Sequence, residues 1–529
     1  MLIDTHQWER VLEGEGQAAL ERMLPSVLLT RRWFGGKARS IESVRIVESI
    51  PVPGSRTTAM LLFLRVQYGE GSSETYALPI TAAFGDDAAR IQREFPQAIV
   101  APLDAVLKDG GRSGVVYDAL WNQEWSRALL DAIGREAQFK GRVGTAFASS
   151  TQAFYDLVTE KENLHPTVMK AEQSNTSVAF GERFILKLYR RVQEGVNPDL
   201  EIGRVLTEMG FAHTPLVGGA MEYVRPNAEP VTVMILQAFV RNQGDAWKFT
   251  LEAIEQYRGR AERQLMNAAV MPQRGLLDLA REDAPFVTRE LIGAYLEPAN
   301  RLGQRTAELH VTLAQCRDNL NLVPEPVSSA YRRARYDSMC QSARQTRALL
   351  ERRLTTLPDA AQEDARMVLD AESSIMDRFR AFRDVTDGGL RIRCHGDYHL
   401  GQVLWTGEKF MLIDFEGEPA RPLNERRLKH PPIMDVAGML RSFHYAAHAV
   451  PNIPDPWTTF WYGWVGAEFL KGYLGTAKHA AFLPKTDGDI GVLLDAYLLE
   501  KALYEVAYEL NNRPDWVGIP LRGIVELLR

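Results

Sequence analysis

Two aspartates and a glutamine in the second half of the chain have the spacing of a phosphoryl-transfer site. Asp397 lies in the run His-Gly-Asp-Tyr-His-Leu-Gly-Gln at residues 395–402, Gln402 follows it five positions later, and Asp414 comes another twelve positions on. Phosphoryl transfer needs a carboxylate beside the attacking hydroxyl and oxygen ligands for Mg²⁺. The pattern predicts Asp397 as the catalytic base in contact with the acceptor, and Gln402 and Asp414 as magnesium ligands.

Taken singly, each of these residues has an ordinary explanation. Asp397 and Asp414 would both suit turns beside strands, and a His-Gly-Asp triplet alone is a weak signal. The amide five positions after the first aspartate and the Phe-Glu-Gly run directly after Asp414 occur together here. That combination favours a kinase over a pair of turns.

A lysine on a strand and a carboxylate on the next helix would complete the groups that position ATP. Lys187 interrupts the apolar run at residues 184–189, upstream of the catalytic run, which favours a phosphate ligand over a surface lysine. An asparagine followed by proline predicts a helix that begins at residue 198. Glu201 and Glu208 share one face of that helix. We expect Glu201 to pair with Lys187, with Glu208 as the alternative.

Two further segments are expected to contact ATP. Ser174 and Thr176 lie in a polar run before a predicted hairpin, where hydroxyl and backbone N–H groups could hold a phosphate. An ordinary polar turn explains the same run. Gln237 and Phe239 end an apolar strand, and we expect this segment to be the hinge that contacts adenine. The sequence contains no Gly-x-x-x-x-Gly-Lys-Ser/Thr motif, which disfavours a P-loop NTPase.

The elements that must position these residues divide into a β-rich half and a helical half. Strands are expected at residues 43–50, 57–68, 74–80, 115–117, 177–180, 184–189 and 231–239. Helices are expected at residues 8–24, 124–137, 197–210, 251–271, 286–313, 328–355, 360–385, 457–473 and 490–510. The predicted fold class is therefore α+β and bilobal. We expect a cap domain at residues 1–105, a nucleotide-binding lobe at 106–241 and a helical lobe at 242–529 that carries the catalytic loop, metal site and sugar site.

The composition excludes several classes of protein. Of the 529 residues, 45% are hydrophobic and 25% charged, which is typical of a globular chain and not of a disordered one. The net charge of −6 argues against binding to nucleic acid or to an anionic membrane. The apolar runs are too short for a membrane span. Three widely spaced cysteines and no signal-peptide pattern predict a cytoplasmic location.

Several segments resemble the maltokinase family. They are the run at residues 395–402, Ile-Asp-Phe-Glu-Gly-Glu-Pro at 413–419, the run at 432–443, Arg-Trp-Phe-Gly-Gly-Lys at 32–37, Ser-Asn-Thr-Ser at 174–177 and Leu-Gly-Gln-Arg-Thr-Ala-Glu-Leu-His at 302–310. The resemblance implies a protein-kinase-like, aminoglycoside-phosphotransferase-like fold with an N-terminal cap, and ATP and Mg²⁺ as cofactors. It implies phosphorylation of maltose to maltose 1-phosphate for α-glucan synthesis, and functional coupling to trehalose synthase. By analogy, Asp435 would begin a helix behind the catalytic loop and hold backbone N–H groups.

The helix expected at residues 490–510 has a second stripe opposite its apolar one. Its apolar stripe is Leu499, Leu503, Val506 and Leu510. Tyrosine rings suit the faces of a sugar, and we expect the sugar to contact Lys501, Tyr504, Glu505 and Tyr508, together with Asp397. Tyr497 belongs to the same stripe. Packing against another helix is the alternative explanation.

Two other functions fit parts of the same pattern. The first is a kinase for a different small acceptor, such as glucosamine or an aminoglycoside; a basic amine would favour an acidic acceptor pocket, so the carboxylates near Asp397 distinguish it. The second is a non-catalytic pseudokinase scaffold, which the intact Lys187, Asp397, Gln402 and Asp414 disfavour.

Overall fold

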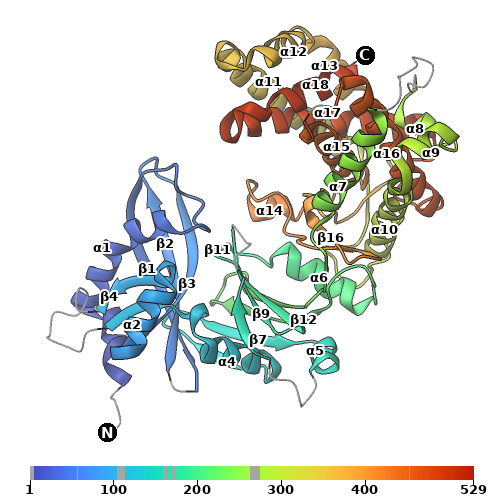
Figure 1. The fold of residues 1–529 in the computed structure, drawn as a ribbon. Coiled ribbons are helices and arrows are strands. Elements are labelled where there is room, and N and C mark those ends of the chain that lie inside the picture. The colour runs from blue at the N-terminus through green and yellow to red at the C-terminus, as the bar shows by residue number, and fades with distance from the viewer. Residues whose placement is uncertain are drawn as a thin grey trace. The chain divides into compact units, whose positions relative to one another are not determined.

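The computed structural model describes residues 5–55, 57–103, 114–158, 164–169, 174–262, 274–451 and 453–528. The chain forms two compact units (Figure 1). The first comprises Met1–Thr207 and Pro215–Arg241, and the second Glu208–Thr214 and Asn242–Arg529. The predicted α+β class, with a β-rich first part and a helical second part, is confirmed.

The first sheet of unit 1 is antiparallel and, among the described residues, has the order β1-β2-β3-β5-β4, with β11 paired to β3. Its strands are β1 (Ile41–Pro53), β2 (Thr58–Tyr68), β3 (Ser73–Phe84), β4 (Ile99–Pro102), β5 (Gly114–Asp118) and β11 (Arg191–Val192). The helices in this part are η1 (Thr5–Leu12), α1 (Gly14–Thr30), α2 (Gly85–Glu94), η2 (Pro96–Ala98) and η3 (Ala119–Trp121). Leu20, Leu24 and Leu28 of α1 recur at helical spacing, are fully buried, and pack in one core with apolar side chains of the strands.

The second sheet of unit 1 has the order β6-β7-β12-β13-β10-β9-β8 among the described residues. Its strands are β6 (Gln138–Lys140), β7 (Thr145–Ser150), β8 (Pro166–Val168), β9 (Thr176–Phe180), β10 (Phe184–Leu188), β12 (Val217–Val224) and β13 (Val231–Ala238). In the described part of the chain, this sheet is accompanied by α4 (Gln123–Gly134), α5 (Gln152–Leu157) and α6 (Pro198–Glu208). The predicted hairpin is confirmed as β9–β10, in which Lys187 pairs with Ser177.

One buried carboxylate joins the two sheets of unit 1. Glu48 on β1 is 2% exposed and accepts the N–H of Gly144 at 2.8 Å and the hydroxyl hydrogen of Tyr223 on β12. The buried Asp118 and Arg190 form a second link. A buried carboxylate is stable only when hydrogen bonds or a cation replace its water, so these contacts hold the sheets together. The domain boundary expected near residue 105 stays a prediction.

Unit 2 is mainly helical. Its helices are α7 (Ala246–Ala261), α8 (Leu276–Leu279), α9 (Phe286–Ile292), η5 (Gly293–Tyr295), α10 (Leu296–Ala314), α11 (Ser329–Arg353), η6 (Leu354–Thr356), α12 (Asp359–Asp370), α13 (Glu372–Asp384), η7 (Leu400–Gln402), α14 (Leu423–Arg426), α15 (Ile433–Ala449), α16 (Asp455–Thr476), α17 (Asp487–Asn512), η8 (Pro514–Trp516) and α18 (Gly518–Leu528). Two short strand pairs accompany them: β14 (Glu325–Pro326) with β15 (Leu390–Arg391), and β16 (Val403–Trp405) with β17 (Phe410–Leu412).

Several expected helices differ from the structure. The helix expected at 8–24 is the 3₁₀ helix η1 followed by α1, which continues to Thr30. The segment expected at 360–385 is two helices, α12 and α13, which meet at Ala371. The segment expected at 286–313 is interrupted at Gly293, whose positive φ of 72° ends α9. The helix expected at 251–271 begins earlier, at Ala246, and its expected end lies outside the described residues.

Candidate active site

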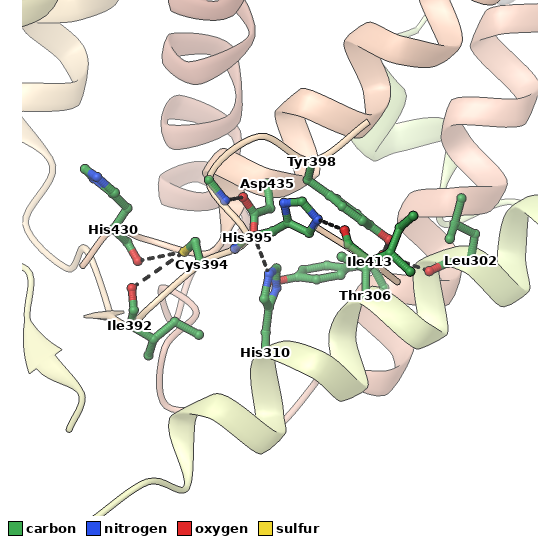
Figure 2. Close-up of polar contacts among 12 residues, drawn as sticks. Leu302, Thr306, His310, Ile392, Cys394, His395, Tyr398, Ile413, His430 and Asp435 are labelled. Atoms are coloured by element: carbon green, nitrogen blue, oxygen red, sulfur yellow. Dashed lines mark hydrogen bonds and ion pairs between the residues drawn. The ribbon is translucent and has the colours of Figure 1, made fainter. Parts of the chain in front are cut away.

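The backbone of the predicted catalytic loop is held by one buried carboxylate. Asp435, in the first turn of α15 and 2% exposed, accepts the N–H of His395 at 2.7 Å and the N–H of Gly396 at 3.0 Å. Its Oδ2 lies 3.1 Å from Nε2 of His310 on α10 (Figure 2). Burial would raise the pKa of Asp435, but the hydrogen bond and charge of His310 and the charge of His395 outweigh burial and lower it. The predicted structural role of Asp435 is confirmed.

Other contacts fix the loop against its neighbours. Nε2 of His395 lies 2.9 Å from the carbonyl oxygen of Ile413, directly before Asp414, and the hydroxyl of Tyr398 lies 2.9 Å from that of Thr306 (Figure 2). Both His395 and Tyr398 are almost fully buried. The loop that carries Asp397 is therefore attached both to α10 and to the segment that carries Asp414.

The two predicted magnesium ligands lie side by side. The N–H of Ile413 donates to the carbonyl of Gln402 at 3.0 Å, and Nε2 of Gln402 donates to Oδ2 of Asp414 at 2.9 Å. Asp414 has a φ of +66°, in the left-handed region that non-glycine residues seldom adopt. Such conformations collect at functional sites, where the surrounding structure enforces them. The pair offers carboxylate and amide oxygens, the donor types that suit Mg²⁺.

A half-buried lysine lies between Asp397 and a second carboxylate. Nζ of Lys501 on α17 is 3.4 Å from Oδ1 of Asp397 and 3.8 Å from Oε2 of Glu418. Burial would lower the pKa of Lys501, but the charges of Asp397, Glu418 and Glu505 outweigh burial and raise it. Burial and the charge of Asp397 raise the pKa of Glu418. At neutral pH Lys501 is therefore a cation that compensates the carboxylates beside it.

These groups line a pocket that lies within unit 2. Its walls come from the catalytic loop, the segment after Asp414 and one face of α17, and include Asp397, Glu418, Arg421, Glu425, Glu500 and Tyr504. Arg335 and Glu500, also at the wall, form an ion pair with each other. The ring of Tyr504 lies 4.8 Å from the ammonium of Lys501. The pocket thus combines a tyrosine face with charged groups that are mostly paired.

Only part of the expected sugar stripe lines this pocket. Lys501 and Tyr504 belong to the wall, as does the buried Tyr497. Glu505 instead accepts Nε and Nη2 of the buried Arg441 at 2.9 and 2.7 Å. Tyr508 is 44% exposed and is not among the lining residues. The reason is the position of the pocket, which covers about two turns of α17 and ends near Tyr504.

Lys187 forms its ion pair with an aspartate that the sequence reasoning missed. On β10 it is 9% exposed, and its Nζ lies 3.3 Å from Oδ2 of Asp199 on α6. The hydroxyl of Tyr189 donates to the same oxygen at 2.9 Å. Glu201, the expected partner, is buried two residues further along the helix, while the alternative, Glu208, is exposed. The signal in the sequence is the aspartate directly after the helix-starting proline.

The expected ATP-contacting groups all lie in unit 1. Ser174 is exposed, and Oγ1 of Thr176 accepts Nε of Arg190 at 2.9 Å. Gln237 pairs with Ile185 in the sheet, and the N–H of Phe239 donates to the carbonyl of Arg183 at 2.8 Å. The backbone N–H of Phe239 is therefore already hydrogen-bonded within the protein. The residues directly before Ser174 lie outside the described residues.

Two parts of the chain match known family models. Residues 284–475 match the phosphotransferase enzyme family, APH, and residues 28–121 match the maltokinase N-terminal cap domain. The two matches cover separate stretches of the chain, one similar to an APH-family phosphotransferase domain and the other to a maltokinase cap. This is the kinase-like α+β fold with an N-terminal cap that the sequence predicted.

Similar proteins include two curated glucosamine kinases. One, from Streptacidiphilus jiangxiensis, is 24% identical over 68% of this chain and 72% of its own length. The other, from Mycolicibacterium smegmatis, is 22% identical over 68% of this chain and 78% of its own. A solved glucosamine kinase in complex with glucosamine, ADP and inorganic phosphate is 17% identical, with a TM-score of 0.62 over 97% of this chain and 99% of that one. The last likeness establishes the fold. Among the described helices, none is both long and apolar enough to cross a membrane.

Proposed function

We propose that the chain is an ATP-dependent kinase that phosphorylates maltose at its anomeric hydroxyl to give maltose 1-phosphate. The observation that carries the choice of acceptor is the half-buried Lys501, which lies 3.4 Å from Asp397 and 3.8 Å from Glu418 in the pocket of unit 2. The pocket therefore already contains a cation, the ammonium group of Lys501. It therefore suits a neutral sugar better than a sugar that brings an ammonium group.

The residues of the chain have separate roles in this proposal. Asp397 would accept the hydrogen bond of the acceptor hydroxyl and take its proton as transfer proceeds. Lys501 would hold the Asp397 carboxylate in place and donate to a second sugar hydroxyl. The ring of Tyr504 would stack on a pyranose face. Gln402 and Asp414 would hold Mg²⁺, and Lys187, positioned by Asp199, would bind phosphate oxygens of ATP. ATP supplies the phosphoryl group, and Mg²⁺ would neutralise its charge.

Electrostatics supports a neutral acceptor. A second ammonium about 6 Å from Lys501 would cost about 3 kcal/mol at an effective dielectric constant of about 20. Glu500 at the pocket wall is paired with Arg335, so its charge is compensated as well. The carboxylates of the pocket are thus mostly matched by cations of the protein itself. The maltokinase cap supports the same acceptor.

The resemblance to maltokinases extends the proposal to a metabolic context. Maltose 1-phosphate would be consumed by a glycosyl transferase that builds α-glucan. Trehalose synthase, which produces maltose from trehalose, would be the functional partner that supplies the acceptor. We propose both links only as functional coupling.

A glucosamine kinase is the second candidate. Its support is the name that both curated relatives carry, at 24% and 22% identity. Glu425 lies at the pocket wall as well, and it could receive an amine that entered from that side.

A panel of acceptors separates the two functions. ATP consumption should be measured with maltose, glucose, trehalose and glucosamine at equal concentrations, and the position of the phosphate should be read by NMR. We expect maltose to give the highest kcat/KM and a phosphate at the anomeric oxygen. Higher kcat/KM for glucosamine would replace the maltose proposal by the second candidate. Turnover with none of them, together with no stabilisation by Mg·ATP in a melting experiment, would point to a pseudokinase.

A further inference from the structure

Two histidines and a glutamate come together where α15 and α18 meet. His444 and His448 are four residues apart on α15 and therefore share a face. Glu526 lies near the end of α18. One ring nitrogen of each histidine and one carboxylate oxygen all lie within 4.8 Å of one another. None of the three residues lines the acceptor pocket described above.

The hydrogen bonds of His448 leave one nitrogen ready to act as a ligand. Its Nδ1 lies 2.9 Å from the carbonyl oxygen of His444. A carbonyl can only accept, so Nδ1 carries the proton and Nε2 carries the lone pair. Nε2 is buried and has no hydrogen-bond partner among the described residues. A histidine whose other nitrogen donates to a backbone carbonyl is the usual arrangement of a metal ligand.

The ring of His444 is also buried. Its side chain is 1% exposed, and Nδ1 is likewise buried without a hydrogen-bond partner among the described residues. Its Nε2 lies 3.3 Å from Oε2 of Glu526. In a tetrahedral zinc site with metal–ligand bonds of about 2.0–2.1 Å, two ligand atoms are about 3.3–3.4 Å apart. The distance between Nε2 of His444 and Oε2 of Glu526 agrees with this separation. A neutral imidazole binds a metal through the ring nitrogen that carries no proton.

The charges around the cluster are compatible with a cation. Arg441 and Arg522 act on His444 electrostatically. Arg441 is held by Glu505 at 2.7 Å, and Arg522 by Asp455 at 2.6 Å. Each positive charge is therefore compensated by a carboxylate. His444 also borders a large cavity of unit 2 that is distinct from the acceptor pocket. This cavity provides a route for an ion and space for a water ligand.

We propose that His444, His448 and Glu526 form a binding site for a transition-metal ion of the zinc class, with a fourth position open to water from the adjacent cavity. Two imidazoles and one carboxylate suit Zn²⁺, whereas Mg²⁺ prefers oxygen ligands. The ion joins α18 to α15, the helix whose first turn holds the proposed catalytic loop through Asp435. The site is separate from the proposed magnesium ligands Gln402 and Asp414.

Metal binding to the full-length, tag-free protein tests this inference. The protein is treated with a chelator and dialysed, and Zn²⁺ is titrated by calorimetry without nucleotide. Co²⁺ then serves as a visible probe, because its absorption band reports a tetrahedral site. The variants are His448→Ala and Glu526→Gln, and the control is His479→Ala, which removes an exposed histidine outside the cluster. Melting curves are recorded with and without Zn²⁺ for every variant.

We expect one Zn²⁺ per chain, a higher melting temperature with Zn²⁺ than with the same concentration of Mg²⁺, and a tetrahedral Co²⁺ spectrum. Either cluster variant should weaken Zn²⁺ binding by at least about tenfold, because loss of even an outer-sphere partner of a metal site has an effect of that order. The control should bind like the unmodified chain. Unchanged affinity in Glu526→Gln, which preserves shape even if His448→Ala fails to fold, would overturn the inference. So would the absence of any Zn²⁺-dependent rise in melting temperature.

Discussion

The side-chain amide of Gln402 donates to Oδ2 of Asp414 at 2.9 Å. The backbones of their segments are also joined, because the N–H of Ile413 donates to the carbonyl of Gln402 at 3.0 Å. The hairpin β16–β17 returns the chain so that residues twelve apart in sequence become neighbours. The proposed metal ligand Gln402 is thus oriented by the carboxylate that would share the metal with it.

Replacing Asp414 should abolish the magnesium-dependent reaction. We predict that Asp414→Ala abolishes productive binding of Mg·ATP, because a charged metal ligand is lost. Gln402→Asn keeps an amide oxygen and should be partly tolerated. The measurement is the initial rate as a function of Mg²⁺ concentration. A rate in Asp414→Ala that depends on Mg²⁺ as in the unmodified chain would contradict the assignment.

Replacing Asp397 should affect turnover and not folding. We predict that Asp397→Asn lowers kcat by roughly 10²–10⁴-fold, the usual contribution of a general base. The side chain keeps its size, and the loop backbone is held by Asp435, so the melting temperature should change little. Steady-state kinetics and a melting curve on one preparation check both statements. Near-normal turnover in a folded variant would exclude Asp397 as the base.

Removing the cation of the pocket should shift the choice of acceptor. We predict that Lys501→Met lowers kcat/KM for maltose and raises the ratio of glucosamine to maltose kcat/KM by at least about tenfold, which is about 1.4 kcal/mol. The reason is that Asp397 and Glu418 lose their internal partner and become free to bind an ammonium. Lys501→Arg, which preserves the charge, is the matched control and should keep the preference for maltose. An unchanged ratio in Lys501→Met would refute the electrostatic explanation.

The spacing of chemically active residues was easier to predict than their partners. Asp397, Gln402 and Asp414 have a fixed separation that one hairpin can close, so the sequence alone suggested that they meet. The expected pairing of Lys187 with Glu201 stays a prediction, whereas the ion pair of Lys187 with Asp199 was not anticipated. Two carboxylates within one turn cannot be distinguished by sequence, because the outcome depends on where α6 packs against β10.

The helix α15 shows a second limit of sequence patterns. Nearly all of its residues from Ile433 to Ala447 are buried, so it lacks the polar face from which helical periodicity is recognised. Only the resemblance to maltokinases indicated a helix there. The pairing of Glu505 with Arg441 on α15 was missed for the same reason: a partner on an unpredicted helix could not be proposed.

The carboxylate of Asp435 should make the folded state sensitive to acid. Its pKa is lowered in the folded protein, so its contribution to stability is present above its unfolded pKa of about 3.9. That contribution is lost as the pH falls through this value toward the folded pKa. We predict that Asp435→Asn destabilises the protein at pH 7 and that the difference from the unmodified chain shrinks below about pH 4.

Denaturant unfolding between pH 3 and pH 7 checks this prediction. The cost at pH 7 should be roughly 1–3 kcal/mol for each buried donor that loses a good acceptor. The control is Asp359→Asn, an exposed aspartate at the start of α12, which should leave the pH profile unchanged. A difference between Asp435→Asn and the unmodified chain that stayed constant with pH would show that the carboxylate charge is not involved.

Tyr504 and Leu503 are neighbours on α17 with opposite surroundings. Tyr504 lines the pocket beside Lys501, whereas Leu503 is 3% exposed and packs in the interior. We predict that Tyr504→Ala lowers kcat/KM for maltose by roughly 5- to 30-fold, the loss of stacking of about 1–2 kcal/mol. The KM for ATP should barely change, since the proposed ATP ligands of unit 1 are untouched.

Leu503→Ala supplies the contrast. It should lower the free energy of unfolding by about 2–5 kcal/mol through a buried cavity, while KM for maltose stays near its normal value in the folded fraction. Tyr504→Phe separates the ring from the hydroxyl, which interacts with Glu418: the ring alone should retain most of the stacking. If Tyr504→Ala destabilised the protein as Leu503→Ala does and left kcat/KM for maltose unchanged, Tyr504 would be a packing residue, and the sugar would have to bind against another wall of the pocket.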